Sequence, residues 1–285
     1  MVQNPFDRSG IAALSDLDSD QCRELYALLE REQSEFLAQE DRFRSPEYFW
    51  PRDALHNWSR IWEYPYTYHH LRRIRASLPA SSTPRVVDLG SGVTFFPFTA
   101  ARLGYHVTCV DNDPVCEKDI PRAASVINVS PGVVDYRVAG AEALPFADQE
   151  IDIVYCVSVL EHIQAFAAVV SEIARILKPG GMLVLTFDLD VRGGCEIGPE
   201  RYYLLKDILN SRFTLSTPAT TTHPMDMLRT DNAPYGFPRL SRAGKVFMFL
   251  KSCAKMILKG KPLLYPPYLL AVEGAVYERQ TNPSI

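Results

Sequence analysis

A glycine-containing loop follows the first strongly apolar segment, in the sequence VVDLGSGVTFF at residues 86–96. Asp88 ends the predicted strand, and Gly90 and Gly92 allow the backbone to approach a ligand closely. The N-terminus of the helix that follows adds free N–H donors. A dinucleotide-binding loop shares these glycines, but it would have a third glycine where this chain has Phe95, and Asp88 would repel a phosphate. The loop therefore suits a ligand with a cationic ammonium group.

Further features follow this loop in a fixed order. Asp111 ends the second predicted strand, about 20 residues further on, where a carboxylate can accept hydrogen bonds from both hydroxyls of a ribose. The segments AGAEALPF, EIDIVYCVSVLEHI and ARILKPGGMLVLTF come next. Together these positions resemble the class I S-adenosylmethionine-dependent methyltransferases, well over residues 84–190 and more loosely over YLLAVEGAVYER near the end. The ordered combination is far more specific than any single motif.

The resemblance implies which residues hold S-adenosylmethionine, whose product after methyl transfer is S-adenosylhomocysteine. Gly90, Ser91 and Gly92 would cradle the methionine part, with Asp88 near its ammonium group, and Asp111 would bind the ribose. The other residues that the resemblance implies lie around the adenine or near the methyl group: Asn112, Ala141, Glu142, Ser158 and Leu160.

Two positions depart from the family pattern. Thr94 replaces the third glycine of the first motif and narrows the backbone freedom of the loop. Gly140 replaces the Asp that accepts from the adenine amino group, so Glu142 or a water would have to compensate. These departures predict weaker cofactor binding or a different hold on the adenine.

Methyl transfer requires aligned reactants and exclusion of water, and a hydroxyl acceptor must also lose a proton to a base. His162, after the fourth strand of the resemblance, is the first candidate base, and His223 in TTTHPMD is the second. For His162 we favour a structural role, because Glu161-His162 accompanies this motif in relatives with unrelated substrates. His223 falls in a loop whose placement the sequence does not fix.

The candidates for binding the acceptor are aromatic or acidic side chains: Tyr64, Tyr66, Asp188 and Tyr203. Asp188 follows the fifth strand at the carboxyl edge of the sheet, where open α/β folds bind ligands, unless it lies in a solvated turn. The tyrosines either cover the acceptor or attach helices to the sheet. We expect attachment for Trp62 and contact with the pocket for one of the neighbouring tyrosines.

The elements that must position these residues alternate from Pro84 onward. Apolar strands are predicted at 85–90, 106–113, 133–140, 151–160 and 182–190, and helices at 95–104 and 165–181. This alternation indicates βαβ units and a parallel sheet covered on both faces. A helix at 201–209 and strands at 213–218 and 268–280 would complete a Rossmann-like α/β fold with a seven-stranded, mostly parallel sheet.

Residues 1–80 are expected to form an N-terminal helical cap, and residues 81–285 the methyltransferase domain. Ser19 would cap the first helix. The aromatic-rich stretch 47–74 would cover a pocket or dock on the sheet, with His69 and His70 opening a helix in contact with solvent or cofactor.

A basic segment interrupts the domain before its last strand. Between Asn232 and Val272 there are seven bases and no acid, and Lys251, Lys255 and Lys259 would form one stripe on a helix. We interpret the insertion 218–266 first as a lid over the substrate. The second interpretation is a peripheral membrane contact through segment 245–261, attracted to anionic lipid, and the third is a solvated helix.

The composition sets further limits. Thirty Lys and Arg against 34 Asp and Glu give the 285-residue chain a net charge of −4, without the basic excess of nucleic-acid binders. No uncharged apolar run approaches the ~20 residues of a membrane span, and the first residues do not follow the pattern of a secretory signal, so a cytoplasmic location is expected. The six cysteines lack any C-x-x-C pair, so no metal site is expected.

The sequence thus predicts an S-adenosylmethionine-dependent methyltransferase that acts on a small molecule, at a hydroxyl oxygen of a specialised metabolite or sugar. The segment CVSVLEH lacks the Asn-Pro-Pro-aromatic motif of enzymes that methylate adenine or glutamine. A nicotinamide-dependent oxidoreductase is disfavoured by Phe95 and Asp88. The other alternative is a binding or scaffold protein that kept the fold and lost catalysis, supported only by Thr94 and Gly140.

Overall fold

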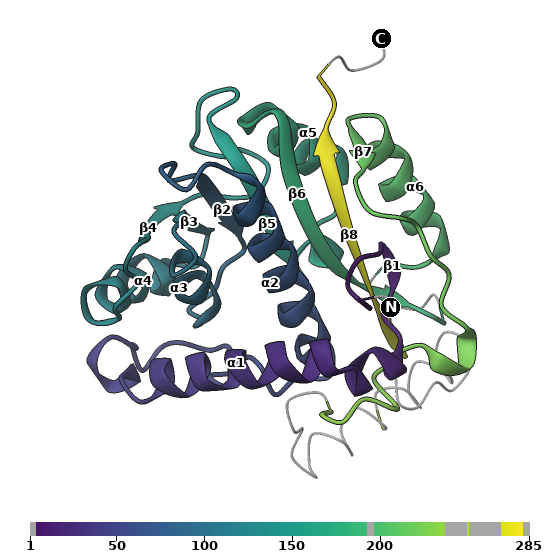
Figure 1. Ribbon diagram of the computed structural model, residues 1–285, viewed down its shortest axis with the longest axis horizontal. Helices are drawn as coiled ribbons and strands as arrows, with labels where there is room; N and C mark the ends of the chain where they lie inside the picture. The colour runs from purple at the N-terminus through teal and green to yellow at the C-terminus, as the bar shows by residue number, and fades with distance from the viewer. Residues whose placement is uncertain (1–3, 193–196, 237–249, 251–268, 282–285) are drawn as a thin grey trace.

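The computed structural model describes residues 4–192, 197–236, 250 and 269–281, which form a mixed sheet with helices on both faces (Figure 1). The strands are β1 Gly10–Ile11, β2 Arg85–Leu89, β3 His106–Asp111, β4 Val133–Val138, β5 Ile151–Val157, β6 Leu177–Asp190, β7 Phe213–Leu215 and β8 Leu270–Arg279. The α-helices are α1 Asp20–Leu37, α2 Arg60–Ser77, α3 Phe96–Ala101, α4 Pro114–Val126, α5 Phe166–Ile176 and α6 Pro199–Asn210. Short 3-10 turns occur at Leu14–Asp18, Glu40–Arg42, Leu160–His162 and Pro224–Asp226.

The strand order is β1-β8-β6-β5-β2-β3-β4, and β7 also pairs with β8. The five strands from β4 to β6 run parallel, while β8 is antiparallel to β6, β1 and β7. The carboxyl ends of β2, β3, β5 and β6 therefore meet at one edge of the sheet. This is the edge where open α/β folds bind their ligands.

Side chains of successive residues in the strands point to opposite faces and build two cores. Val86 packs into a core that includes residues of α1, α2, α3 and α4, and Val87 into one that includes residues of α5 and α6. Strands buried on both faces explain why their sequences are continuous apolar runs rather than alternating ones. The Rossmann-like α/β fold predicted from the sequence is confirmed.

The sheet has eight described strands rather than the seven predicted, and the extra strand is β1. Gly10 and Ile11 lie in the segment expected to be helical, but they pair with Gly274 and Glu273 of β8. Two residues are too few for a strand pattern to show in the sequence. The helix α4 was also not predicted, since Pro121 lies inside it.

The helix α2 is the central element of the N-terminal region. It begins at Arg60, so His69 and His70 lie well inside it instead of opening a helix. Every residue from Ile61 to Leu71 is buried, because α2 packs between α1 and the strands β5, β6 and β8. This burial stabilises a helix that Pro65 would otherwise disfavour. Gly274 lets α2 approach β8, since a Cβ there would lie 2.7 Å from the Trp62 ring.

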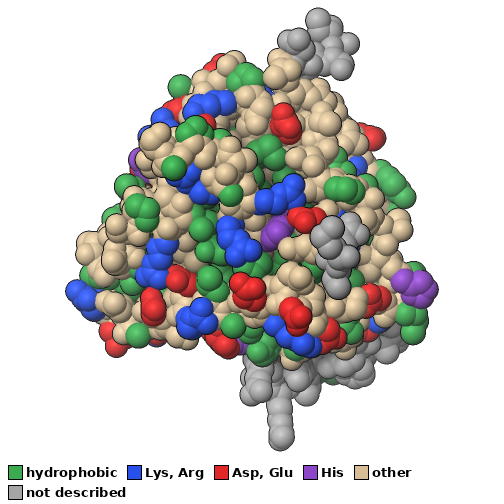
Figure 2. Space-filling model, in the orientation of Figure 1, with side chains coloured by type: hydrophobic (Ala, Val, Ile, Leu, Met, Phe, Trp, Pro, Cys, Tyr) green, Lys and Arg blue, Asp and Glu red, His purple; other side chains and the backbone are tan. Residues whose placement is uncertain are grey.

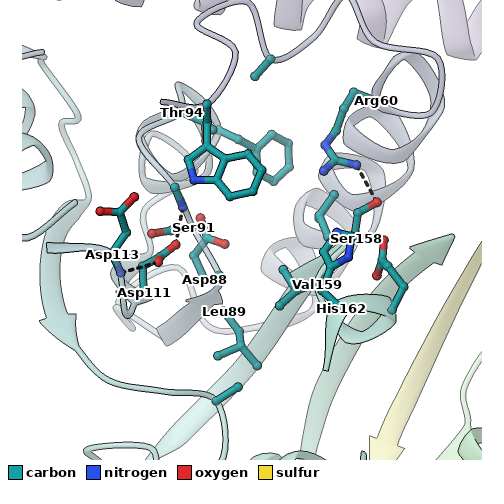
Figure 3. Close-up of a pocket in the computed structure, with 18 of the residues that line it drawn as sticks. Arg60, Asp88, Leu89, Ser91, Thr94, Asp111, Asp113, Ser158, Val159 and His162 are labelled. Carbon is teal, nitrogen blue, oxygen red and sulfur yellow. Dashed lines mark hydrogen bonds between the residues drawn. The ribbon is translucent and has the colours of Figure 1, made fainter. Parts of the chain in front are cut away.

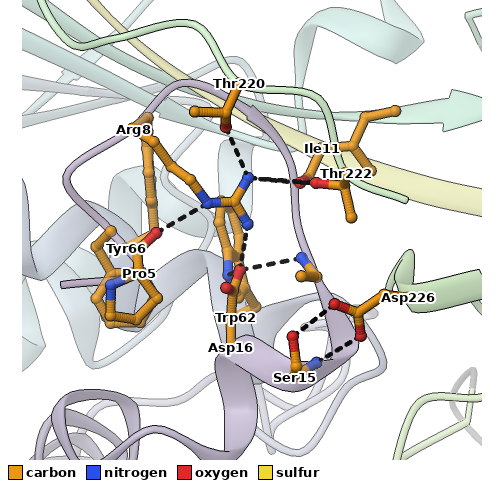
Figure 4. Close-up of polar contacts among 12 residues, drawn as sticks. Pro5, Arg8, Ile11, Ser15, Asp16, Trp62, Tyr66, Thr220, Thr222 and Asp226 are labelled. Atoms are coloured by element: carbon orange, nitrogen blue, oxygen red, sulfur yellow. Dashed lines mark hydrogen bonds and ion pairs between the residues drawn. The ribbon is translucent and has the colours of Figure 1, made fainter. Parts of the chain in front are cut away.

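Arg8 and Asp16 fasten the first residues to α2 and to the chain after β7 (Figure 4). One oxygen of Asp16 accepts from Arg8 at 2.6 Å and from the Trp62 indole at 2.9 Å. The Arg8 guanidinium also donates to the hydroxyls of Thr220 and Thr222, at 3.2 and 3.3 Å. Three segments far apart in the sequence are thereby joined through one ion pair.

His70 is a buried titratable group in α2. Its ring lies 4.5 Å from that of Tyr66 and 5.0 Å from that of His69, and its Nε2 has no hydrogen-bond partner among the described residues. Burial lowers the pKa of His70 to about 3, and the neighbouring charges of His69 and Arg73 act in the same direction. The folded protein therefore holds this histidine neutral.

We predict that His70 makes folding sensitive to mild acid. In the unfolded chain its pKa is about 6.5, so between pH 6.5 and 3 the unfolded state binds a proton that the folded state does not. The free energy of unfolding should fall by up to about 1.4 kcal/mol per pH unit across this window. In urea unfolding at pH 7, 6 and 5, the free energy of unfolding of His70→Gln should fall less with decreasing pH than that of wild type. His223→Gln, at an exposed position, is the matched control.

Candidate active site

A cavity of about 1270 Å³ opens at the carboxyl edge of the sheet (Figure 3). One part of its wall consists of the loops after β2, β3, β4 and β5, and the other of residues 48–60 together with Tyr64, Asp188 and Leu270. The cavity is larger than the roughly 300–1,000 Å³ of an ordinary small-ligand pocket. It therefore has room for two ligands side by side.

The loop after β2 has a backbone conformation that glycine favours. Gly90 and Gly92 have φ of +73° and +53°, in the left-handed region. A Cβ at Gly90 would lie 2.4 Å from a methyl group of Val159, so no other residue fits there without a shift. The Gly90 N–H donates to the carbonyl of Val110 at 2.8 Å and ties the loop to β3.

Asp88 lies beside this loop with only 5% of its surface exposed. Burial raises the pKa of its carboxyl to about 8; the neighbouring Tyr155 hydroxyl acts against this shift, and the nearby charge of Asp111 contributes to it. A cation bound in the cavity would favour the ionised form and reverse this shift. The site is thus electrostatically suited to a positively charged group.

Asp111, at the end of β3, holds the loop in place. Its two oxygens accept hydrogen bonds from the backbone N–H groups of Gly92 and Asp113, each at 2.9 Å (Figure 3). Each carboxylate oxygen has a further lone pair, so the group can still accept from the hydroxyls of a ligand.

Most of the predicted cofactor residues line this one cavity: Asp88, Gly90, Ser91, Gly92, Asp111, Asn112, Ala141, Glu142 and Ser158. Leu160 is the exception, because its side chain is buried in the core beside α5 and α6. Thr94 and Gly140, the two departures from the family pattern, are lining residues as well. A Cβ at Gly140 would meet nothing within 4 Å, so the space beside it is open.

The wall opposite the glycine loop is built around a buried carboxylate. Glu63, in α2, has a fully buried side chain and accepts from the Arg60 guanidinium. Its other oxygen accepts from the hydroxyls of Ser158 at 2.8 Å and Thr186 at 2.6 Å. Arg60 also donates to Ser158 at 2.6 Å (Figure 3). One side chain thereby joins α2 to the ends of β5 and β6.

Ser158 is held in a strained conformation by this network. Its φ of +50° is uncommon for a residue other than glycine. Its backbone N–H donates to the carbonyl of Thr186 at 3.0 Å, and its hydroxyl bonds to Arg60 and Glu63. Strain of this kind persists where surrounding contacts fix it, often at functional sites.

Sequence reasoning missed Arg60 and Glu63. The pair forms an Arg-x-x-Glu spacing on one helix face, which an exposed ion pair on a solvated helix shares. Only the packing of α2 onto the sheet brings the pair beside Ser158, 95 residues after Glu63 in the chain.

Three of the predicted catalytic and acceptor-binding residues line the cavity: His162, Asp188 and Tyr64. The Tyr64 ring stacks on Phe96, with ring centres 4.6 Å apart. Asp188 donates its backbone N–H to Glu161 at 3.3 Å, which brings the end of β6 next to the turn that carries His162.

The other three candidates are not among the lining residues. His223 is exposed and accepts from the Met225 N–H, capping the turn Pro224–Asp226. Tyr66 is fully buried against Trp62, with ring centres 4.6 Å apart, so it packs in the core instead of facing the cavity. Tyr203 is 66% exposed beside Tyr202.

Charged side chains of both signs are interspersed on the face drawn in Figure 2, without a continuous basic surface among the coloured residues. Within the described ranges, no group of three or more His, Cys, Asp or Glu side chains is placed to hold a metal ion. No helix in that part of the chain is both long and apolar enough to cross a bilayer. The predicted basic segment 245–261 lies outside the described residues except for Leu250.

Comparisons with known proteins agree with this geometry. Residues 87–185 match a family model described as a methyltransferase domain. A ubiquinone biosynthesis O-methyltransferase of Xylella fastidiosa is 34% identical over 125 residues, which are 41% of this chain and 49% of the relative. One of Xanthomonas euvesicatoria is 38% identical over 105 residues, 36% of this chain and 42% of the relative. The matched parts thus span less than half the length of these curated relatives.

One solved structure extends the likeness over nearly the whole chain. The crystal structure of the [4+2]-cyclase SpnF covers 96% of this chain and 100% of its own, with a TM-score of 0.51 and 16% sequence identity. At this identity the likeness concerns the fold alone. Because a cyclase shares this fold, the fold does not identify the reaction, which has to be inferred from the residues of the site.

We predict that Glu63 is essential for stability. Glu63→Ala would leave the Arg60 guanidinium without its buried partner and should lower the free energy of unfolding by roughly 3–5 kcal/mol. Glu24→Ala, at an exposed position of α1, is the control and should change it by less than about 0.5 kcal/mol. Urea unfolding of both variants measures this difference. Equal stability of the two variants would show that the buried network contributes little.

Proposed function

We propose that the chain, whose residues 87–185 match a methyltransferase domain, transfers a methyl group from S-adenosylmethionine to a small molecule. The observation that carries this proposal is the buried carboxylate of Asp88 beside the glycine loop, in one cavity with Asp111. Burying this carboxyl beside a second acid, Asp111, is costly, and a bound cation would offset that cost.

The residues present fit the cofactor that the family uses. Asp88 would bind the ammonium group, the loop Gly90–Gly92 would lie against the methionine part, and Asp111 would accept from the ribose hydroxyls. When bound, S-adenosylmethionine supplies a methyl group on a cationic sulfonium. The open space at Gly140 leaves the adenine amino group to Glu142 or to water, as the sequence predicts.

We propose a hydroxyl oxygen as the methyl acceptor. The relatives named above are O-methyltransferases, which supports oxygen over nitrogen or carbon. The volume of the cavity leaves space for an acceptor beside the cofactor. Arg60, Ser158, His162 and Asp188 present polar groups there, and Tyr64 presents a ring. This combination suits a small polar metabolite with a hydroxyl group, such as a sugar or a specialised metabolite.

The first test is calorimetric titration with S-adenosylhomocysteine, which we expect to bind with micromolar affinity. Asp111→Asn should weaken binding about tenfold or more, since a charge-assisted hydrogen-bond pair is lost. The same variant should bind a 2′,3′-dideoxy analogue as well as wild type does, because that ligand lacks the hydroxyls to which Asp111 would bond.

Two results would contradict the proposal. No binding at millimolar ligand would exclude the cofactor. Binding without methyl transfer to any hydroxyl compound in an acceptor screen would favour the alternative of a binding protein that kept the fold. A third result bears on Asp111 alone: an equal loss of affinity for both ligands in Asp111→Asn would show that this residue only holds the loop in place.

A second prediction follows from the pKa of Asp88, which burial raises to about 8. At pH 7 this carboxyl is mostly protonated, and a bound ammonium group would ionise it. Binding of S-adenosylhomocysteine at pH 7 should therefore release about one proton, and affinity should rise with pH up to about 8. Titration in two buffers with different ionisation enthalpies measures the release. Asp88→Asn should abolish it, whereas proton release unchanged in this variant would assign it to another group.

A further inference from the structure

Glu161 is a buried acid that the sequence analysis did not assign to the reaction. It lies in the turn Leu160–His162 after β5, lines the cavity, and is only 2% exposed. Its Oε1 accepts the backbone N–H of Asp188 at 3.3 Å. Its Oε2 is buried and has no hydrogen-bond partner among the described residues. A buried carboxylate oxygen without a partner is costly, so it calls for a ligand that donates to it.

The groups around Glu161 come from three elements. His162 follows it in the same turn, Arg60 and Glu63 face it from α2, and Asp188 faces it from β6. Burial raises its pKa to about 7, which Glu63 reinforces, while His162 and Arg60 act in the opposite direction. A carboxyl that titrates near neutral pH can both accept and return a proton under working conditions.

We propose that Glu161 is the general base of the reaction and accepts the proton of the acceptor hydroxyl at Oε2. This inference rests on the proposed function. As the acceptor oxygen forms its bond to the methyl carbon, the carbon–sulfur bond breaks and its electron pair stays on sulfur. The hydroxyl proton passes to Glu161. A sulfonium, a hydroxyl and a carboxylate thus become a thioether, an ether and a carboxylic acid, all of them neutral.

Charge balance in a buried site favours this assignment over His162. Proton transfer to a carboxylate removes the negative charge in the same step that removes the positive charge of the sulfonium. Proton transfer to a neutral histidine would leave a cation in the cavity. Isolated charges are costly in a water-excluded site, so the step that cancels both is favoured.

The first experiment needs no turnover. Infrared difference spectra of protein labelled with ¹³C at glutamate carboxyl groups should show a protonated carboxyl band that disappears as the pH rises through about 7. Glu161→Gln should lack this band, and Glu24→Gln, at an exposed position of α1, should keep it. A band retained in Glu161→Gln would assign the titration to another glutamate and overturn the proposal.

The second experiment measures the pH profile of kcat/KM with any acceptor found in the screen. Glu161→Gln keeps the size of the side chain and an oxygen for the Asp188 N–H, and should lower kcat/KM about 10²-fold or more. The acidic limb of the profile should also be lost, while affinity for S-adenosylhomocysteine stays within about threefold of wild type. Loss of the limb in His162→Gln but not in Glu161→Gln would make His162 the base.

The two proposals fail in different ways. A protein that does not bind S-adenosylhomocysteine refutes the proposed function. A protein that binds it and methylates a hydroxyl, with Glu161→Gln active and its pH profile unchanged, refutes only the role of Glu161. If Glu161→Gln does not fold, the infrared titration of labelled wild-type protein still decides whether a glutamate titrates near neutral pH.

Discussion

The cavity depends on the full pairing of one buried carboxylate, that of Glu63. A buried ion is tolerated only when charged and hydrogen-bonded partners replace its water, and here Arg60, Ser158 and Thr186 do so. Any shift of α2 relative to β5 and β6 would break the hydrogen bonds of Glu63 with Ser158 and Thr186, although Arg60, on the same helix, would stay beside it. The cavity wall at residues 48–60, which continues directly into α2, is therefore held at a fixed position against the loops that follow the strands. The same pairing keeps Ser158 in its left-handed conformation, so its strain is balanced by the contacts that also position Arg60.

The ion pair of Arg8 and Asp16 attaches the N-terminal segment to the same helix, α2, through Trp62. Asp16 accepts a hydrogen bond from the indole of Trp62 in α2, and Arg8 donates to the hydroxyls of Thr220 and Thr222. The residues after β7 are thus attached to the same N-terminal segment that pairs with β8. The first 80 residues share one core with the sheet, which makes them part of the framework of the site as well as its cover.

The grouping of the candidate cofactor residues in one cavity was predictable because most of them stand at or just after the end of a strand. Asp88, Gly90 and Asp111 follow apolar runs, and parallel strands bring their carboxyl ends together without further information. The rest of the cavity was predictable only in part: Tyr64, His162 and Asp188 do line it, but Arg60 and Glu63 reach Ser158 only through the packing of α2. Tyr64 and Tyr66 illustrate the difference. Two residues apart on a helix, they point in different directions, one to the cavity and one to Trp62, and no local pattern says which.

The charges of the cavity bear on how it would release its product. The Arg60 guanidinium is already paired with Glu63, so a cationic ligand would meet mainly acids in the lining. A bound cation favours the ionised forms of Asp88 and Glu161, whose pKa values burial raises, and the lining then carries an excess of negative charge. Such a lining stabilises a cationic ligand in the ground state, which by itself would slow a reaction that removes the cation. If one of these acids is the base, this ground-state stabilisation is removed during the reaction, because the carboxylate loses its negative charge in the same step in which the sulfonium loses its positive charge. The product complex then lacks the attraction between the lining and the sulfonium, while the ammonium group and the ribose that Asp88 and Asp111 would bind remain. The transfer therefore weakens the hold of the cavity on its ligand without abolishing it.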